Sequence, residues 1–241
     1  MDLSLLFLGF LLGMRHALES DHLAAVASLA TRSPSLGQTI RQGAAWGLGH
    51  TLTLFLFGSA VLLLDRVVPE RLAQGLEFAV GIMLLILGLD VLRRLRRERL
   101  HFHAHRHDDG TLHLHLHAHR EGEPHQPLHR HPHPRPEPAG FPVRALLVGL
   151  MHGMAGSAAL ILLTLQTVQS PLTGLLYIAL FGVGSIAGMA AISVVIAVPL
   201  RLSANRLGWL HQGLMALIGV TTIGIGGVLI YRIGFVDGLL F

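Results

Sequence analysis

Near its start the chain reads GMRHALESDHLAA, from Gly13 to Ala25. This stretch lies inside an apolar run from Leu3 to about Ala30, which is longer than the roughly 20 residues that a membrane-spanning helix needs. Charged groups at membrane depth cost at least about 2.5 kcal/mol each on insertion scales, so a span that keeps several of them predicts a functional site. The middle of this run holds Arg15, His16, Glu19, Asp21 and His22.

Two imidazoles and two carboxylates within a few residues are a ligand set for a divalent transition metal. On a regular helix, at about 100° per residue, His16 and His22 lie about 120° apart and Asp21 about 140° from His16. Either the helix unwinds between Glu19 and Asp21, or two of these side chains bind an ion while a third orients a ligand. The alternative is a buried polar network without metal, in which Arg15 pairs with Glu19.

The composition is that of a membrane protein. Of the 241 residues 51% are hydrophobic and only 13% are charged, against about 25% in soluble domains. The mean hydropathy is +0.58. We therefore expect an all-α polytopic membrane protein in a lipid bilayer, with no nucleic-acid partner despite a basic pI of about 10.9, because the arginines lie at the ends of the spans. The chain has no cysteine, which excludes disulfides and thiolate metal sites.

Six apolar segments predict six transmembrane helices. They cover about Leu3–Ala30, Ala44–Leu64, Leu72–Leu92, Val143–Val168, Leu172–Leu200 and Leu210–Ile233. The first has no basic leading region and no cleavage site, so we expect a retained helix and not a signal peptide.

The two halves of the chain repeat each other. The stretch from Gly149 to Ser157 restates Gly13 to Asp21 at an offset of 136, which matches His152 to His16. A second match follows at an offset of 138 in the segment around residue 212, and a weaker one at an offset of 135 around residue 182. Three spans per unit would insert the second copy the other way up, as two inverted three-helix repeats with a substrate site near the membrane midplane. The expected domains are residues 1–92, a loop at 93–142, and residues 143–241.

Arginines set the expected topology. The connector after the first span, the long loop and the connector after the fifth span hold most of them, and the other side has Arg66, Arg71 and Arg232. The positive-inside rule then places the loop in the cytoplasm and both termini outside, with the protein in the cell (inner) membrane.

Two further histidines lie in apolar segments. His50 opens the second span or lies early in it, and is either a ligand or an interfacial side chain that bonds a carbonyl. His152 lies among glycines, which favour close helix packing, so it is either a ligand equivalent to His16 or a satisfied packing residue. Ser157 is a weak candidate oxygen ligand on the same path.

The loop contains twelve of the 17 histidines, between positions 101 and 133. Its composition predicts disorder, and its imidazoles predict loose capture of Ni, Co, Zn or Cu that weakens below about pH 6. The alternative is a low-complexity insertion without function. The candidates for capture are His101, His103, His105, His107, His113, His115, His117 and His119.

The run from His16 to His22 resembles the His-x-x-x-x-Asp-His signature of the nickel/cobalt transporter family, called NiCoT or NicO. Leu48-Gly49-His50-Thr51 resembles that family's second motif. The resemblance implies transport of Ni²⁺ or Co²⁺ as substrate, without a cofactor, with His16, Asp21, His22 and His50 on the path. In its second half, which lacks the acidic motif of the classical uptake permeases, the chain resembles the shorter relatives associated with urease genes. The efflux branch has glycine where this chain has Asp21, which favours uptake.

The metal-site set is therefore His16, Glu19, Asp21, His22, His50 and His152. A phosphate-binding loop and a His-Glu-x-x-His pair are both absent, so neither ATP hydrolysis nor a zinc protease is expected, and the chain is not expected to be an enzyme. Zn²⁺ or Mn²⁺ as substrate, efflux instead of uptake, a cytoplasmic metallochaperone as partner, and a metal-binding accessory protein that does not transport all stay open. The sequence does not fix the oligomeric state.

Overall fold

The structure, a computed structural model, describes residues 3–33, 35–64, 69–97, 100–106, 112–118, 140–153 and 170–240. Its elements in chain order are α1 (Leu3–His16), α2 (Ser20–Ala30), α3 (Leu36–Leu64), α4 (Glu70–Arg97), β1 (Leu100–Arg106), β2 (Leu112–Ala118), α5 (Val143–Gly153), α7 (Pro171–Arg206), α8 (Gly208–Tyr231) and the π-helical turn η1 (Arg232–Val236). In these ranges every element outside the two strands is helical, so the prediction of an α-helical protein is confirmed.

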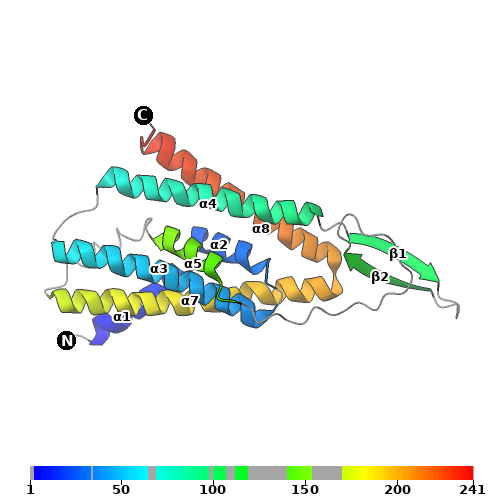
Figure 1. Ribbon diagram of the computed structural model, residues 1–241, viewed down its shortest axis with the longest axis horizontal. Helices are drawn as coiled ribbons and strands as arrows, with labels where there is room; N and C mark the ends of the chain where they lie inside the picture. The colour runs from blue at the N-terminus through cyan, green and yellow to red at the C-terminus, as the bar shows by residue number, and fades with distance from the viewer. Residues whose placement is uncertain are drawn as a thin grey trace.

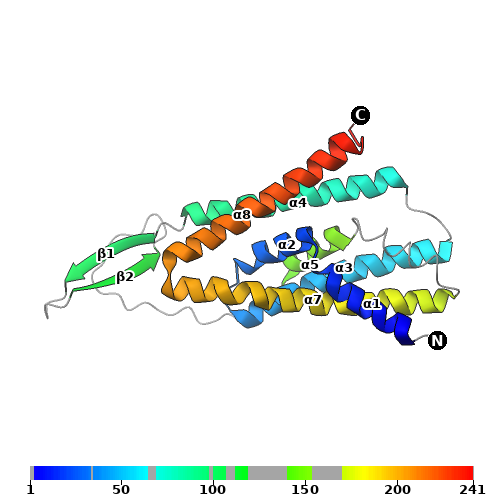
Figure 2. The ribbon, with the colours of Figure 1, turned by 180° about the vertical axis from the view of Figure 1, so that it is seen from behind.

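The helices form an elongated bundle with two short helices inside it. Helices α4 and α8 run along one side, and α1, α3 and α7 run along the other (Figure 1). Helices α2 and α5 lie between these two sides, as the reverse view also shows (Figure 2). The inner position of α2 and α5 places their ends near the middle of the long axis of the bundle.

The outer surface of the bundle is apolar. On α8, Leu217, Val220 and Val228 are 61 to 68% exposed, and large exposed apolar surfaces are rare on soluble monomers. Within the described residues three helices are long and apolar enough to cross a membrane: Glu70–Arg97, Pro171–Ala204 and Gly208–Val236. The chain is therefore a membrane protein, while the count of six spans stays a prediction.

The first two predicted spans differ from the structure. The apolar run from Leu3 to Ala30 is not one helix, because α1 ends at His16 and α2 begins at Ser20. The helix of the second predicted span is α3, which begins at Leu36, eight residues before the expected start at Ala44. Its first turns carry polar residues, which the apolar pattern did not include. The fourth predicted segment begins as α5, and its remainder, residues 154–168, lies outside the described residues.

Glycines bring the long helices into backbone contact at matching places. Gly13 of α1 lies against the backbone of Phe181 on α7, and Gly149 of α5 lies against the backbone of Trp46 on α3. The two contacts are equivalent in the repeat, because Gly149 matches Gly13 at an offset of 136 and Phe181 matches Trp46 at an offset of 135. The same exchange relates two contacts between α4 and α8, Gly81 with Gly226 and Gly88 with Gly219. A side chain at these glycines would force the helices apart.

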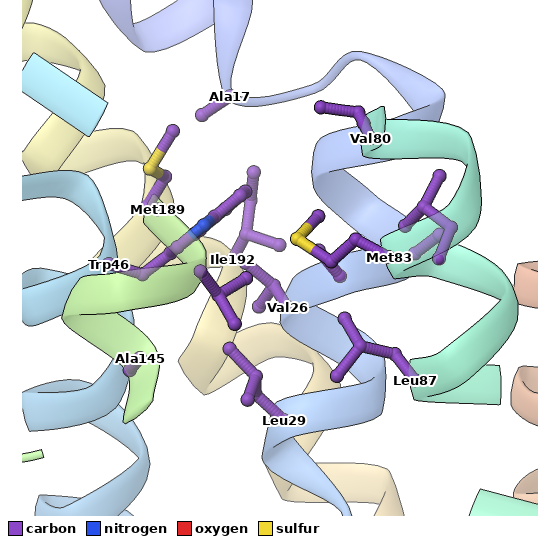
Figure 3. Packing of buried hydrophobic residues seen from close by; sticks show 14 of the residues in the cluster. Ala17, Val26, Leu29, Trp46, Val80, Met83, Leu87, Ala145, Met189 and Ile192 are labelled. Carbon is purple, nitrogen blue, oxygen red and sulfur yellow. The ribbon is translucent and has the colours of Figure 1, made fainter. Parts of the chain in front are cut away.

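A core of apolar side chains surrounds α2. Val26 and Leu29 of α2 point between the side chains of α4, such as Met83, and those of α7, such as Ile192 (Figure 3). Trp46 of α3 is fully buried in the same cluster. Because α2 is apolar on several sides, it is held firmly by its neighbours, and its first turn is fixed relative to α3 and α5.

An ion-pair cluster fixes the other end of α2. Asp90 of α4 accepts from Arg32, and Arg94 Nε lies 3.4 Å from an Asp90 oxygen. Arg94 also donates to the carbonyl of Thr31, which caps α2, at 3.1 Å. The cluster thus joins the end of α2 to α4.

Part of the histidine-rich loop forms a hairpin. Strands β1 and β2 pair antiparallel with His103 opposite His115, and they project beyond one end of the bundle (Figure 1). The composition of the loop predicts disorder, whereas in these two strands histidine alternates with leucine, phenylalanine or alanine, and this period of two favours a strand. The rest of the loop up to residue 139 lies outside the described residues.

Candidate metal centre

The centre is built at the break between α1 and α2. The chain leaves α1 through two tight turns, in which Leu18 N donates to Arg15 O at 2.9 Å and Glu19 N donates to His16 O at 3.1 Å. Glu19 is extended, with φ −62° and ψ 145°, and caps α2. Asp21 in the first turn of α2 favours a helix start, because a negative charge is stabilised at the positive end of the helix dipole. The break predicted between Glu19 and Asp21 thus lies two residues earlier, at Ala17–Glu19.

Four imidazoles from four helices meet at this break. His16 ends α1, His22 lies in the first turn of α2, His50 lies in the middle of α3, and His152 lies near the end of α5. All four are between 0 and 4% exposed. The ring centres of His16 and His22 are 4.4 Å apart, and those of His22 and His152 are 4.2 Å apart. One interpretation of the sequence placed His50 at the start of a span, as an interfacial side chain. In the structure it lies in the middle of α3 and is fully buried.

Asp21 joins the two halves of the chain. Its Oδ1 lies 3.0 Å from His22 Nδ1 and accepts the backbone N–H of His22 at 2.9 Å. Its Oδ2 lies 2.9 Å from His152 Nε2. One carboxylate therefore holds an imidazole from each half, although its side chain stays 28% exposed.

Glu19 has a different place. Its Oε1 lies 2.7 Å from His16 Nδ1, and His16 Nε2 lies 3.2 Å from His50 Nε2. The Glu19 side chain is 46% exposed, so it lies at the edge of the centre. Arg15 is exposed, and Glu19 contacts His16 in place of the Arg15 partner that the metal-free alternative requires.

Several buried nitrogens of the centre have no hydrogen-bond partner among the described residues. They are His22 Nε2, His50 Nδ1, His152 Nδ1 and Trp46 Nε1. An unpaired buried polar group costs about 1–3 kcal/mol, so a protein retains several of them where they serve a ligand. Neutral imidazole nitrogen is the commonest metal ligand in proteins.

The donors fall into two groups that suit a metal ion. One consists of His16, His22 and His50, and the other of Asp21, His22 and His152. Within each group the donor atoms lie within 4.8 Å of one another. The carbonyl end of α1 faces this point, and the negative end of a helix dipole favours a cation.

Apolar aromatic rings close the centre. The ring of Trp46 lies 5.3 Å from that of His22 and 5.4 Å from that of His152, between centroids. The ring of Phe181, on α7, lies 5.3 Å from that of His16. Sequence reasoning missed both, because an aromatic residue in an apolar helix has the same pattern whether it fills a core or borders a site.

The other candidates lie elsewhere or outside the described residues. His101, His103 and His105 belong to β1, and His113, His115 and His117 belong to β2, at the end of the bundle and not at the centre. His107, His119 and Ser157 lie outside the described residues.

Comparison with known proteins agrees with this chemistry. Residues 3–135, which hold three of the four buried histidines and Asp21, match the family described as High-affinity nickel-transport protein. The chain belongs to the NicO family. This is a family of transporters and not of enzymes, so Ni²⁺ is a substrate for it and no cofactor is required.

Two relatives of the chain are described. The chain is 35% identical over 238 residues to the urease accessory protein UreH of Bacillus sp. (strain TB-90), an alignment that covers 98% of this chain and 95% of UreH. Over 82 residues it is 40% identical to Chloroplast protein FOR GROWTH AND FERTILITY 1 of Arabidopsis thaliana, which covers 33% of this chain and 22% of that protein. No solved structure matches the chain.

Proposed function

We propose that this NicO protein is a permease for Ni²⁺ or Co²⁺ in which the ion passes through the buried centre at the break between α1 and α2. The observation that carries the proposal is the meeting of four buried imidazoles and one carboxylate at a helix break. A broken helix inside a membrane protein exposes backbone groups, which is tolerated where it lines a cavity or an ion path.

The residues take distinct roles in this proposal. His16, His22, His50, His152 and Asp21 are the ligands. Imidazole nitrogen suits Ni²⁺, Co²⁺ and Zn²⁺, whereas Mg²⁺ and Ca²⁺ require oxygen ligands, so a centre rich in imidazole rejects the abundant cellular cations.

Glu19 is a positioning residue in the same proposal. A carboxylate that accepts from Nδ1–H of a histidine leaves the Nε2 lone pair free for a metal and fixes the ring orientation. The 2.7 Å contact between Glu19 and His16 Nδ1 has this arrangement. Glu19 therefore acts through His16 and is not itself a ligand.

We further propose six spans arranged as two inverted repeats. The exchanged glycine contacts support this: Gly13 with Phe181 and Gly149 with Trp46 are related by a swap of the two halves. His16 and His152, which match in the sequence repeat, both reach the centre. In such transporters the substrate binds near the midplane between the repeats.

The arginines support a topology with the hairpin in the cytoplasm. Arg94, Arg96 and Arg97 end α4 close to β1, and Arg32 and Arg41 lie on the neighbouring connector and helix start. Basic residues concentrate on the cytoplasmic side of membrane proteins. We propose a multi-pass protein of the cell (inner) membrane with both termini outside, whose loop histidines capture the ion and deliver it to a cytoplasmic metallochaperone.

Metal accumulation in cells tests the permease and its direction. Cells express the wild type, His16→Ala or His211→Ala, with Ni²⁺ or Co²⁺ at trace levels. His211 is the matched control, because its ring lies at the carbonyl of Leu200, outside the centre. We expect more cell metal than in the empty control, lost with His16→Ala and kept with His211→Ala. Less metal than in the control would mean efflux, and no change for either ion would contradict a permease.

The description of UreH as a urease accessory protein supports a second candidate, a metal-binding accessory protein that does not transport. Purified protein in lipid vesicles separates the two. A permease moves Ni²⁺ into vesicles without any other protein, and His16→Ala abolishes this flux. Binding of Ni²⁺ without flux would favour the accessory role.

A further inference from the structure

The donors of the centre form two groups and not one. In the described part of the chain, His16 and His50 belong only to the first group, and Asp21 and His152 belong only to the second. His22 belongs to both. The ring centres of His50 and His152 are 6.1 Å apart, farther than either ring is from that of His22. His22 thus lies between the two outer sets of donors.

The two groups differ in donor chemistry and charge. The first offers three neutral nitrogens, and the second offers two nitrogens and a carboxylate oxygen. A divalent ion keeps its full charge in the first group and is partly neutralised in the second. The first group is therefore the more selective, because three imidazoles suit Ni²⁺ and Co²⁺ and not Mg²⁺. The second group binds a divalent cation more strongly, because opposite charges attract in a buried site.

The nitrogens of His22 suit it to serve both groups. Its Nδ1 lies 3.0 Å from Asp21, whereas its Nε2 has no hydrogen-bond partner among the described residues. Its ring lies 4.4 Å from that of His16 and 4.2 Å from that of His152, nearly equal distances. An ion held by His22 is thus close to both outer sets of donors.

We propose that the two groups are successive positions of one ion, with His22 a ligand in both, and that the transport step moves the ion between them. The inference rests on the proposed permease function. Two divalent ions at once would share a ligand and repel each other four times as strongly as two unit charges at the same distance. The positions are therefore occupied in turn. Because His22 never releases the ion, the step exchanges only the outer ligands and avoids a bare ion in a buried site.

The chain carries a reporter for this test. It has two tryptophans, Trp46 and Trp209. Trp46 lies 5.3 Å from the shared His22, and Trp209 is exposed on α8. In a Trp209→Phe background, quenching of the remaining fluorescence by Co²⁺ reports binding at the centre and not at the loop histidines. Flux into lipid vesicles reports transport by the same full-length protein.

The deciding comparison uses His50→Ala, which removes an outer ligand of the first group alone, and His22→Ala, which affects both groups. We expect His50→Ala to keep the Co²⁺ affinity reported by Trp46 within about tenfold of the wild type. Flux should fall at least about a hundredfold, because replacing a residue that only hydrogen-bonds to a metal ligand already costs 10–100-fold in affinity or activity. His22→Ala loses both. We expect the His152→Ala variant to bind Co²⁺ more weakly than the His50→Ala variant does. Its Co²⁺ absorption bands should also shift, because the second group of donors has lost one of its three ligands.

The results separate the inference from the function on which it rests. If His50→Ala abolishes Co²⁺ binding as fully as His22→Ala does, the five residues form a single site and the two-position inference is wrong, although wild-type flux would still support a permease. If the wild type itself gives no flux while binding Co²⁺, the permease fails and the inference fails with it. Thermal unfolding of each variant in detergent identifies any variant that is merely misfolded.

Discussion

Replacing Gly149 by alanine tests whether helix packing positions the metal centre. Gly149 lies on α5, one turn before His152, against the backbone of Trp46. An added Cβ would meet the Trp46 carbonyl oxygen and would lie 2.9 Å from the backbone carbonyl carbon of Trp46. Backbone atoms cannot turn aside as a flexible side chain does, so α5 itself must move.

The required movement sets the expected effect. A carbon pair at 2.9 Å is at least about 0.6 Å closer than ordinary contact, and the carbonyl oxygen lies nearer still, so the movement is at least this large. Misplacement by 1 Å costs on the order of a hundredfold in a positioned site, so a movement of about 0.6 Å predicts a loss of flux of roughly tenfold or more. Overpacking costs about 1–3 kcal/mol, and alanine returns up to about 1 kcal/mol through its helix propensity. The net fall in the free energy of unfolding is then about 1 kcal/mol.

Gly224→Ala is the matched control. Gly224 lies on α8 with nothing within 4 Å of an added Cβ, so the same substitution brings the helix propensity without the collision. The assay is Ni²⁺ flux into lipid vesicles, together with thermal unfolding in detergent. We expect Gly224→Ala to transport like the wild type and to be equally or more stable. Equal flux for the two alanine variants would refute the positioning argument.

The other predictions concern the ends of the bundle. Asp90→Asn removes the negative charge that Arg32 and Arg94 share. We expect the free energy of unfolding to fall by about 1 kcal/mol, a modest value because all three side chains are partly exposed. An unchanged midpoint of thermal unfolding in low salt would contradict this expectation. Deletion of residues 101–133 should lower the number of Ni²⁺ ions bound in equilibrium dialysis at about pH 7.5, and the difference should vanish near pH 5, because imidazole with a pKa of about 6.5 is protonated there and does not bind metal. A difference that persists in acid would assign the lost binding to groups other than histidine.

Sequence reasoning selected the proposed ligands because polar side chains are unusual in an apolar segment. His16, Asp21 and His22 are costly in an apolar run, so their presence identifies a site without any structure. His152 was identified by its match to His16 in the repeat. These arguments depend on residue type and spacing alone, which the sequence contains in full.

The remaining features depend on contacts between distant residues. Arg32 and Asp90 are 58 positions apart, and no local pattern relates them. The depth of His50 was misjudged because polar residues hide the start of α3. The hairpin was missed because the high histidine content of the loop was interpreted as a sign of disorder. The alternation of histidine with apolar residues, which has the period of a strand, was not considered.

The glycine contacts that exchange partners between the two halves have the form of an isologous interface, in which one surface meets a copy of itself. Two copies of a single three-helix chain would make such an interface equally well. A homodimer, however, must place identical residues at both equivalent positions. The present chain has Asp21 in one half and Ser157 at the matching position of the other. A single chain has no such constraint, so it can carry Asp21 in one half without a second aspartate at the matching position of the other.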